Sequence, residues 1–385
     1  TNYTKLTNNG CLILKNLLYN NQKICAKEKN NLQYFVCYKI INMLLFVFLL
    51  SFSVQKHLVK ASEDATNDEI LHDDRPIIGI LSQKITEEFT PYVTHDSTYI
   101  AASYVKWIEG AGAQVIPILS TYSKKKVLKL VRSINGVLFP GGAAPLNDSN
   151  YARAARWIFN EAIRINDFEK RPFPLWGTCL GFEVLNVLGS GLSPNEILSE
   201  YDSENLLLEI DFTKEAFDSR LFHTIDMGLM RKMMFKKLSL HMHQAGINPD
   251  VYEKNSRIRK MFKVLASNLD KKGKEFVSVI EGRKYPFYGT QFHPEKNIYE
   301  WTRNEKINHS PDAILAAQYF ANFFVNEARK SYIENMPVRR LKHLEDHLMF
   351  RYSPVYSGGS SLFEQVYTFK NQTINNRIKA KGNAL

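Results

Sequence analysis

A single cysteine stands between two glycines in the stretch PLWGTCLGFE, residues 174–183. An apolar strand-like segment precedes it, and a helix-like segment follows it. The pattern Gly177-x-Cys179-x-Gly181 at such a turn is typical of a nucleophile elbow, in which glycines permit a strained turn that exposes the side chain at the carboxyl end of a sheet. Because the N-terminus of the following helix favours a thiolate, we expect Cys179 to be exposed, ionised and nucleophilic. The alternative is a buried cysteine that only packs at the turn.

A thiolate nucleophile needs a base, and the stretch YGTQFHPEKN at residues 288–297 offers one. His293 stands at the end of an apolar strand, and Glu295 follows two residues later, at a spacing that lets it orient the imidazole. Because active sites of α/β proteins assemble at the carboxyl ends of strands, we predict that His293 is catalytic. The alternative is a surface or packed histidine.

The nucleophile also needs donors for the oxyanion that develops during attack. Gly141 and Gly142 follow a third apolar strand and supply backbone N–H groups that no side chain covers. The N–H of Leu180, directly after the cysteine, would be a second donor. A Gly-Gly pair alone indicates only a turn, and the interpretation as oxyanion donors depends on the cysteine and histidine motifs that accompany it.

Two further histidines stand in the stretch LHMHQAGI, at positions 241 and 243. Alternate residues of a strand face the same side, so His241 and His243 could bind a metal together. No third ligand stands at a recognisable spacing, and we therefore predict no zinc site.

Apolar runs alternate with helical periodicity along the first half of the chain. Strands are predicted at 76–81, 115–118, 136–139 and 173–177, and helices at 99–111, 124–133 and 150–167. This alternation predicts an α/β fold with a doubly wound, mostly parallel sheet flanked by helices. The rest is richer in strands, with LLLEI, FKVLA, FVSVIE and PFYGTQF between 199 and 292, before a helix at 312–330. Residues 331–370 are polar and irregular, but the aromatics of 352–369 indicate packing onto the domain.

The N-terminal segment is predicted to be separate from this catalytic domain, which we place at 75–370 with a polar tail at 371–385. Residues 1–42 are rich in Asn and Lys and are interpreted as an upstream extension without structure. The apolar run that follows Met43 suits a secretory signal peptide at 43–61 and is shorter than the ~20 residues that span a bilayer. Residues 62–74 form a polar linker. The alternative to the signal peptide is a signal anchor.

Cleavage of this signal peptide would expose Ser62 and remove Cys11, Cys25 and Cys37. The mature chain would then contain only Cys179, which excludes an intramolecular disulfide. The expected destination is the secretory pathway, ending in a lysosome or vacuole or outside the cell, with no stable membrane insertion after cleavage. Weak support comes from three glycosylation sequons, at Asn147, Asn308 and Asn371.

The net charge of +11 is unevenly placed along the chain. Residues 1–61 hold eight Lys and one acidic residue, which leaves 42 basic against 38 acidic residues in the remainder. A nucleic-acid footprint should lie on the folded domain, so we predict no nucleic-acid partner.

Taken together, FPGG (139–142), WGTCLGFE (176–183) and QFHPEKNIYEW (291–301) resemble the γ-glutamyl hydrolases of the class I glutamine amidotransferase-like superfamily. The resemblance extends to RPIIGILSQ, YIAASYVKWIEGAGAQVIPI, FFVNEARK and the C-terminal aromatic segment, and so covers roughly residues 75–370. The elbow alone would indicate only the superfamily, whereas the whole set is specific.

The resemblance implies a role for each matching residue. Cys179 would be the nucleophile, His293 the general acid and base, and Glu295 the third member of the triad. His243, in the run HQAGI, matches a second active-site histidine that contacts substrate or supports the nucleophile, and His241 does not match it. Glu183 stands where glutamine amidotransferases usually carry Gln, which favours hydrolysis over nitrogen transfer, and we place it with His243 among the substrate-binding residues.

The expected reaction is hydrolysis of γ-glutamyl bonds in folylpoly-γ-glutamates and antifolate polyglutamates through an acyl-enzyme, with neither a metal nor an organic cofactor. Because such substrates carry several carboxylates, Lys296 is a candidate cationic contact. One alternative is a glutaminase-type amidotransferase subunit that releases ammonia from glutamine, and another is a non-catalytic binding protein on the same fold. Members of the family are often dimeric, and no residue here predicts an interface.

Overall fold

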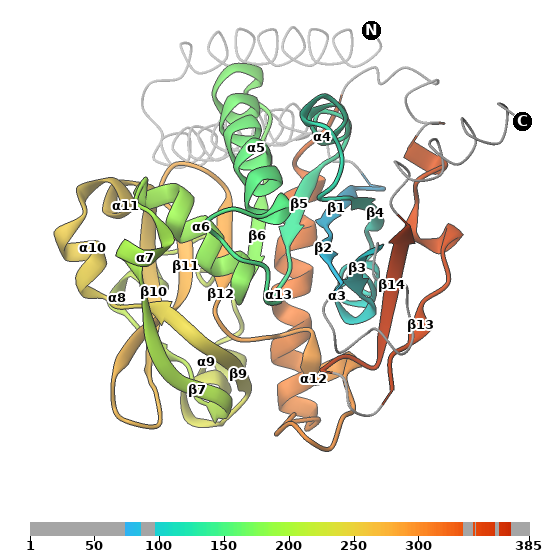
Figure 1. The fold of residues 1–385 in the computed structure, drawn as a ribbon. Helices are drawn as coiled ribbons and strands as arrows, with labels where there is room; N and C mark the ends of the chain where they lie inside the picture. Colours follow the sequence, from blue (N-terminus) through green and yellow to red (C-terminus); the bar gives the residue numbers. More distant parts are fainter. Residues whose placement is uncertain (1–73, 86–96, 334–341, 343, 359–361, 371–385) are drawn as a thin grey trace, which may run out of the picture. The chain divides into compact units, whose positions relative to one another are not determined.

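An eight-stranded sheet carries the site, in the strand order β4-β1-β5-β6-β12-β11-β10-β8 (Figure 1). Its strands are β1 (Ile77–Leu81), β4 (Gln114–Ile118), β5 (Gly136–Phe139), β6 (Leu175–Thr178), β8 (Asp211–Phe212), β10 (Phe262–Leu269), β11 (Glu275–Gly282) and β12 (Phe287–Thr290). The five strands from β4 to β12 pair in parallel, and β11, β10 and β8 continue the sheet antiparallel. The predicted α/β class with a mostly parallel sheet is confirmed, and the four predicted N-terminal strands are found to within two residues at their ends.

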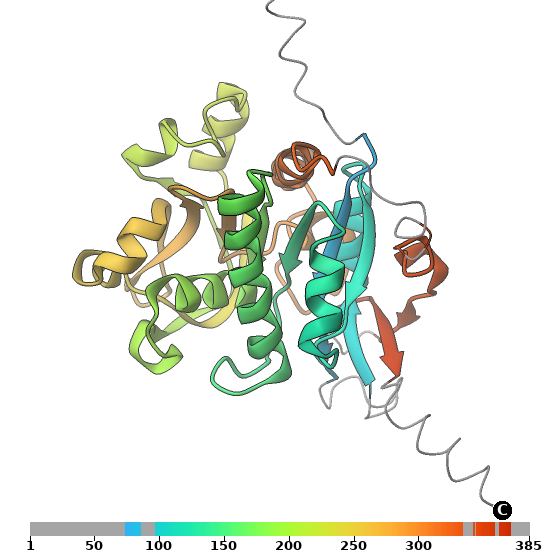
Figure 2. The same cartoon turned by 90° about the horizontal axis from the view of Figure 1, so that it is seen from above.

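Helices cover both faces of this sheet, with α13 and α5 on opposite sides in Figure 2. Strand β5 shows why: Leu138 joins one apolar core, while Val137 and Phe139 join the other, since alternate residues of a strand face opposite sides. The first core contains α3, α9 and α13, and the second contains α4, α5 and α6. The helices are α3 (Ala102–Glu109), α4 (Lys124–Val131), α5 (Asn150–Arg164), α6 (Leu180–Ser190), α7 (Pro194–Ile197), α8 (Lys214–Phe217), α9 (Met227–Phe235), α10 (Asp250–Lys254), α11 (Ser256–Met261), α12 (Lys296–Tyr299) and α13 (Pro311–Arg329).

A second, four-stranded sheet has the order β13-β14-β3-β2 and is antiparallel throughout. Its strands are β2 (Gln83–Lys84), β3 (Ser97–Ala101), β13 (Val355–Tyr356) and β14 (Gln365–Lys370). The prediction of a helix from residue 99 is wrong at its start, because 97–101 form β3 and the helix begins at Ala102. The partner of β3 is β14, which lies far away in the sequence, so local periodicity could not reveal the strand. The expected packing of the C-terminal aromatics onto the domain is confirmed, since Phe363 and Phe369 are buried.

Strands β7 (Leu198–Leu208) and β9 (Ser239–Ile247) form a separate antiparallel pair. Their register shifts twice, on either side of the pairing between Ser203 and His243. The strand predicted from LLLEI is therefore the end of a longer one. Strand β9 carries both histidines of the LHMHQAGI stretch.

This computed structural model describes residues 74–85, 97–333, 342, 344–358 and 362–370, all within one compact unit at 71–385. The predicted extension, signal peptide, most of the linker, the polar tail and the Asn371 sequon lie outside the described residues. Within those ranges, no helix is long and apolar enough to cross a bilayer.

Candidate active site

Cys179 forms the turn between β6 and α6, as the elbow pattern predicts. Its backbone has φ 52° and ψ −109°, a region that non-glycine residues rarely adopt. Holding such a conformation costs on the order of 1–3 kcal/mol, and surrounding contacts must enforce it. The N–H of Cys179 donates to the Thr290 carbonyl at 2.9 Å, which ties the turn to the end of β12.

The two flanking glycines are required by close packing of backbone on backbone. A Cβ on Gly181 would lie 1.9 Å from the Phe139 carbonyl oxygen, and one on Gly177 would lie 2.3 Å from the Gly181 carbonyl oxygen. Neither glycine has a positive φ; the strained residue is the cysteine itself. The first turn of α6 is therefore pressed against β5, which aims the side chain of Cys179 at the carboxyl ends of the parallel strands.

The thiol of Cys179 is buried, with 6% of the residue exposed. Its Sγ lies 3.8 Å from the Met242 carbonyl oxygen of β9. Burial raises the pKa of the thiol well above its ordinary value, the Glu183 carboxyl raises it further, and the Leu180 N–H only partly offsets them. The prediction of an exposed and ionised cysteine is wrong, because the β7–β9 pair covers the elbow. The resting group is a neutral thiol, and attack needs a base.

The base is in place at the end of β12. His293 Nδ1 lies 2.7 Å from Glu295 Oε1, and both residues are buried. Because a carboxylate only accepts, we assign the proton to Nδ1, which leaves Nε2 as the acceptor. The backbone N–H of His293 donates to the Leu240 carbonyl at 3.0 Å, which holds the loop against β9.

Gly141 shows how near the imidazole and the thiol are to one another. A Cβ on this glycine would lie 2.7 Å from His293 Cε1 and 3.1 Å from Cys179 Cβ. The ring and the cysteine thus flank the same point of the backbone, and both line the same pocket. The structure brings together the two residues that the sequence places 114 positions apart.

Tyr104 of α3 is a site residue that the sequence reasoning missed. Its hydroxyl accepts the Gly141 N–H at 2.8 Å and lies 3.3 Å from His293 Nδ1. Burial raises the pKa of Tyr104 well above its ordinary value, so the hydroxyl keeps its proton. In the sequence Tyr104 is one more apolar position of a predicted helix, and only the fold shows that its hydroxyl reaches the base.

The contact with Tyr104 rules out Gly141 as one of the predicted oxyanion donors. The Gly141 N–H is already donated to the tyrosine hydroxyl, so it is not available to substrate. Within the described part of the chain, the Gly142 N–H donates to no protein acceptor, and a Cβ there would lie 2.2 Å from Gln83 Oε1. Gln83 Nε2 donates to the Gly141 carbonyl at 2.7 Å and fixes this loop. Gly142 remains a predicted donor together with Leu180, whose N–H faces the sulfur.

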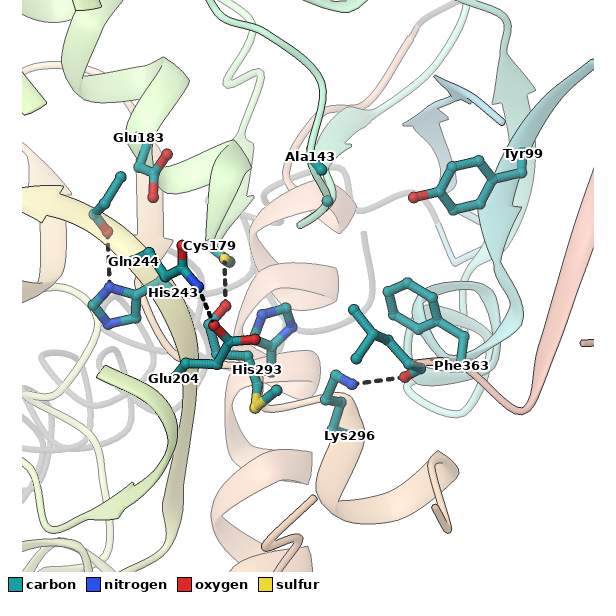
Figure 3. A pocket seen from close by; sticks show the side chains of 14 residues that line it. Tyr99, Ala143, Cys179, Glu183, Glu204, His243, Gln244, His293, Lys296 and Phe363 are labelled. Atoms are coloured by element: carbon teal, nitrogen blue, oxygen red, sulfur yellow. Dashed lines mark hydrogen bonds between the residues drawn. The ribbon is translucent and has the colours of Figure 1, made fainter. Parts of the chain in front are cut away.

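These groups open into a pocket of about 400 Å³ (Figure 3). Its lining consists of Tyr99, Gly142, Ala143, Cys179, Glu183, Glu204, Met242, His243, Gln244, Ala245, His293, Lys296, Leu362 and Phe363. Figure 3 shows His243 and Gln244 on one side of Cys179, and Phe363 and Tyr99 on the other. One wall therefore comes from β9, and the opposite wall comes from the second sheet.

The two predicted substrate contacts at the β9 end of the pocket are both neutral near pH 7. Burial lowers the pKa of His243 to about 3, and its Nδ1 lies 2.8 Å from the Ala245 carbonyl oxygen. Burial raises the pKa of Glu183 to about 8, although Gln291 Nε2 donates to its carboxyl at 3.1 Å. Among the described residues, no group of three or more His, Cys, Asp or Glu could hold a metal ion.

Lys296 lines the pocket, but it is not a free cation. Its Nζ donates to Glu305 Oε1 and Oε2 at 2.8 and 2.7 Å and to the Leu362 carbonyl at 2.8 Å. These contacts use the three donors of the ammonium group, and the side chains of Lys296 and Glu305 are each only 2% exposed. Binding of substrate carboxylates by Lys296 stays a prediction, and the protein partners of its ammonium group are an observation against it. The residue holds the segment that carries Phe363 into the pocket.

Comparison with known proteins gives one consistent result. The family model described as Peptidase C26 matches residues 76–295. γ-Glutamyl hydrolase of Homo sapiens is 40% identical over 295 residues, covering 77% of this chain and 90% of the relative. γ-Glutamyl hydrolase B of Dictyostelium discoideum is 34% identical over 306 residues, covering 79% and 86%, and γ-glutamyl hydrolase 1 of Arabidopsis thaliana is 35% identical over 300 residues, covering 77% and 83%.

Among solved structures, the glutaminase domain of Trypanosoma brucei CTPS with bound acivicin covers 67% of this chain and 96% of that chain. It has a TM-score of 0.43 and 15% sequence identity.

Replacing Glu183 by Gln is expected to make Cys179 easier to ionise. The Glu183 carboxyl is neutral below its pKa of about 8 and negative above it, and that negative charge opposes a neighbouring thiolate. The rate of Cys179 alkylation is measured from about pH 7 to about pH 10 by mass spectrometry of the peptide that contains this residue. The pH at which the rate reaches half its maximum should be lower in Glu183→Gln than in the parent, by on the order of one pH unit. Glu204→Gln is the matched control, since this carboxyl lines the same pocket but is exposed. An unshifted midpoint in Glu183→Gln, or an equal shift in Glu204→Gln, would contradict the coupling.

Replacing Lys296 by Met is expected to lower the free energy of unfolding by about 3–5 kcal/mol, because Glu305 is left as a buried, unpaired carboxylate. The double variant Lys296→Met/Glu305→Leu removes both charges and should recover most of this loss. Urea unfolding of the three proteins checks the prediction. If the single variant is as stable as the parent, Lys296 does not act as a structural clamp.

Proposed function

Since the chain belongs to the peptidase C26 family, which includes the γ-glutamyl hydrolases, we propose that it hydrolyses γ-glutamyl bonds through a cysteine acyl-enzyme. The observation that carries the proposal is the shared position of the Cys179 thiol and the His293 imidazole around Gly141, with Glu295 holding the imidazole. A thiol that keeps its proton, beside an imidazole oriented by a carboxylate, is the arrangement that general-base attack needs.

In the first half-reaction the thiol proton passes to His293 Nε2 while the sulfur attacks the γ-carbonyl carbon. The carbonyl oxygen becomes an oxyanion that accepts the N–H groups of Gly142 and Leu180. Glu295 accepts the Nδ1–H of His293 and stabilises the imidazolium that forms. The imidazolium then gives its proton to the departing amine as the C–N bond breaks, which leaves a thioester on Cys179.

In the second half-reaction water replaces the amine. His293 Nε2 takes a proton from the water as the oxygen attacks the thioester carbon, and the same two N–H groups hold the second oxyanion. Collapse breaks the C–S bond, releases the γ-carboxylic acid and returns the proton to the sulfur of Cys179. The enzyme ends in its starting protonation state, so the cycle consumes only water and substrate.

For the substrate we propose folylpoly-γ-glutamates and related antifolate polyglutamates. The pocket supports this with an aromatic wall at Tyr99 and Phe363 and a polar wall at His243 and Gln244. Glu183, at the position where amidotransferases usually carry Gln, is an observation against the alternative of a glutaminase subunit. The assembly of Cys179, His293 and Glu295 at one site is evidence against the alternative of a non-catalytic binding protein.

We further propose that the chain enters the secretory pathway, with a lysosome, vacuole or the cell exterior as its destination. The apolar segment at 43–61 and the sequons support this. Asn147 is exposed on the loop before α5, and Asn308 is partly exposed before α13, so both can carry a glycan on the surface.

Replacing Cys179 by Ala is expected to lower kcat for a defined pteroylpolyglutamate by up to about 10⁶-fold, because the covalent intermediate can no longer form. The products are separated and identified by chromatography and mass spectrometry, and circular dichroism checks that the variant folds. Free glutamine is the matched control substrate, and the parent should release no ammonia from it. Turnover retained in Cys179→Ala would refute the nucleophile, and ammonia release would favour the glutaminase alternative.

Expression of the full sequence in a eukaryotic secretory host is expected to release a protein that begins at Ser62 and carries glycans on Asn147 and Asn308. N-terminal sequencing, and peptide mass spectrometry before and after glycosidase treatment, measure both features. A membrane-bound product with an uncleaved 43–61 segment would instead support the signal anchor.

A further inference from the structure

Four groups follow one another on one face of β9. Ser239, His241, His243 and Ala245 alternate along the strand, so their side chains share a side. His243 lines the pocket, whereas His241 is fully buried behind it and does not line the pocket. His241 takes no part in the proposed reaction.

The hydrogen bonds between these groups fix both tautomers. His243 Nδ1 lies 2.8 Å from the Ala245 carbonyl oxygen, which can only accept, so Nδ1 carries the proton. In the neutral ring, Nε2 is then an acceptor. His241 Nδ1 lies 3.1 Å from this Nε2 and must donate to it. Both ring nitrogens of His243 are therefore occupied by protein partners.

Packing leaves the two rings little freedom to turn away. The Phe276 ring meets both edge-on, with centroid distances of 5.2 Å to His241 and 4.8 Å to His243. Phe292 adds a second edge contact to His241 at 5.7 Å. The donor at His241 Nδ1 is thus held in line with its acceptor by aromatic contacts that do not depend on protonation.

Protonation of His243 would break this arrangement. An imidazolium has two N–H donors and no acceptor, so the Nδ1–H of His241 would face another N–H. The groups that bear on His243 electrostatically are His241 on its own strand, His293 on the loop after β12 and Asp270 on the loop between β10 and β11, while Cys179, Glu183 and Glu204 share the pocket. Burial lowers the pKa of His243 to about 3 and His293 acts in the same direction, while the bond to the Ala245 carbonyl and the Asp270 carboxyl both act to raise it.

We propose that His241 is a positioning residue that keeps His243 neutral by donating to its Nε2, so that the imidazole of His293, and not that of His243, accepts the proton of Cys179. The inference rests on the proposed function only where a rate is measured. During attack the thiol proton must go to His293, because only His293 is placed to return it to the leaving amine. A second imidazole with a free Nε2 in the same pocket would compete for that proton and would add a positive charge beside the imidazolium.

The test compares two replacements of His241 that differ in one donor. In His241→Asn the side-chain amide can still donate to His243 Nε2, whereas Phe in His241→Phe fills a similar volume without a donor. His241→Leu repeats the donor-free case with an aliphatic side chain. In the donor-free variants His243 Nε2 loses its donor, so the pKa of His243 is expected to rise from about 3 toward the ordinary histidine value of about 6.5, which would be its upper limit because the ring stays buried.

The first readout is the pH profile of kcat and KM with pteroyl diglutamate. The parent and His241→Asn should share one profile, while the donor-free variants should show an extra acid ionisation and up to about tenfold lower kcat at pH 5.5 that recovers at pH 8. A merely structural role would lower kcat equally at all pH values. That result, or a profile of His241→Asn that matches the donor-free variants, would overturn the proposal.

The second readout needs no activity, so it separates failure of this inference from failure of the proposed function. In resting enzyme with ¹⁵N-labelled histidine, the His243 signals of the parent and of His241→Asn should keep the Nδ1–H pattern between about pH 5 and pH 8, and those of His241→Phe should titrate. Titration of His243 in the parent, or a fixed tautomer in both donor-free variants, would overturn the proposal even if γ-glutamyl hydrolysis is established.

Discussion

The close contact between the first turn of α6 and the backbone of β5 is the constraint on which the rest of the site depends. Because Gly181 has no side chain, the first turn of α6 can lie close to the Phe139 carbonyl, and Cys179, directly before the helix, has a strained, positive φ. This backbone conformation sets the direction of the Cys179 side chain. A hydrogen bond from the Cys179 N–H to the Thr290 carbonyl connects the turn to the end of β12. Because β12 also ends in the loop of His293, the nucleophile and the base are positioned by adjacent parallel strands of one sheet.

Burial then determines the protonation states around the sulfur. The thiol of Cys179, the Glu183 carboxyl and the His243 ring all lie away from water, and desolvation favours the neutral form of each. The oriented pair of His293 and Glu295 is therefore the place where charge can develop during the reaction. A site of this kind suits general-base attack by a thiol better than a preformed thiolate.

In the pocket wall opposite β9, the buried charge of Lys296 positions a neighbouring segment of the chain. Lys296 lies three residues after the base, and its ammonium group joins Glu305 to the Leu362 carbonyl. This contact holds Leu362 against the pocket and brings Phe363 beside Tyr99, with their ring centroids 6.5 Å apart. The same ion pair would contribute little on a surface; buried, its integrity matters because either partner alone would be an unpaired charge.

Local patterns in the sequence were sufficient to predict several parts of this protein. The alternation of apolar and helical segments gave the parallel half of the sheet, and the spacing of Gly177, Cys179 and Gly181 identified the elbow, while the HPE run identified the base and its carboxylate. Four features became visible only in the folded chain: the thiol is buried, Tyr104 accepts the Gly141 N–H, Lys296 is already paired, and β3 is a strand. Each of these depends on a partner distant in the sequence, such as β9, Gly141, Leu362 or β14, and neither periodicity nor spacing can report which distant group will remove water or fill a hydrogen bond.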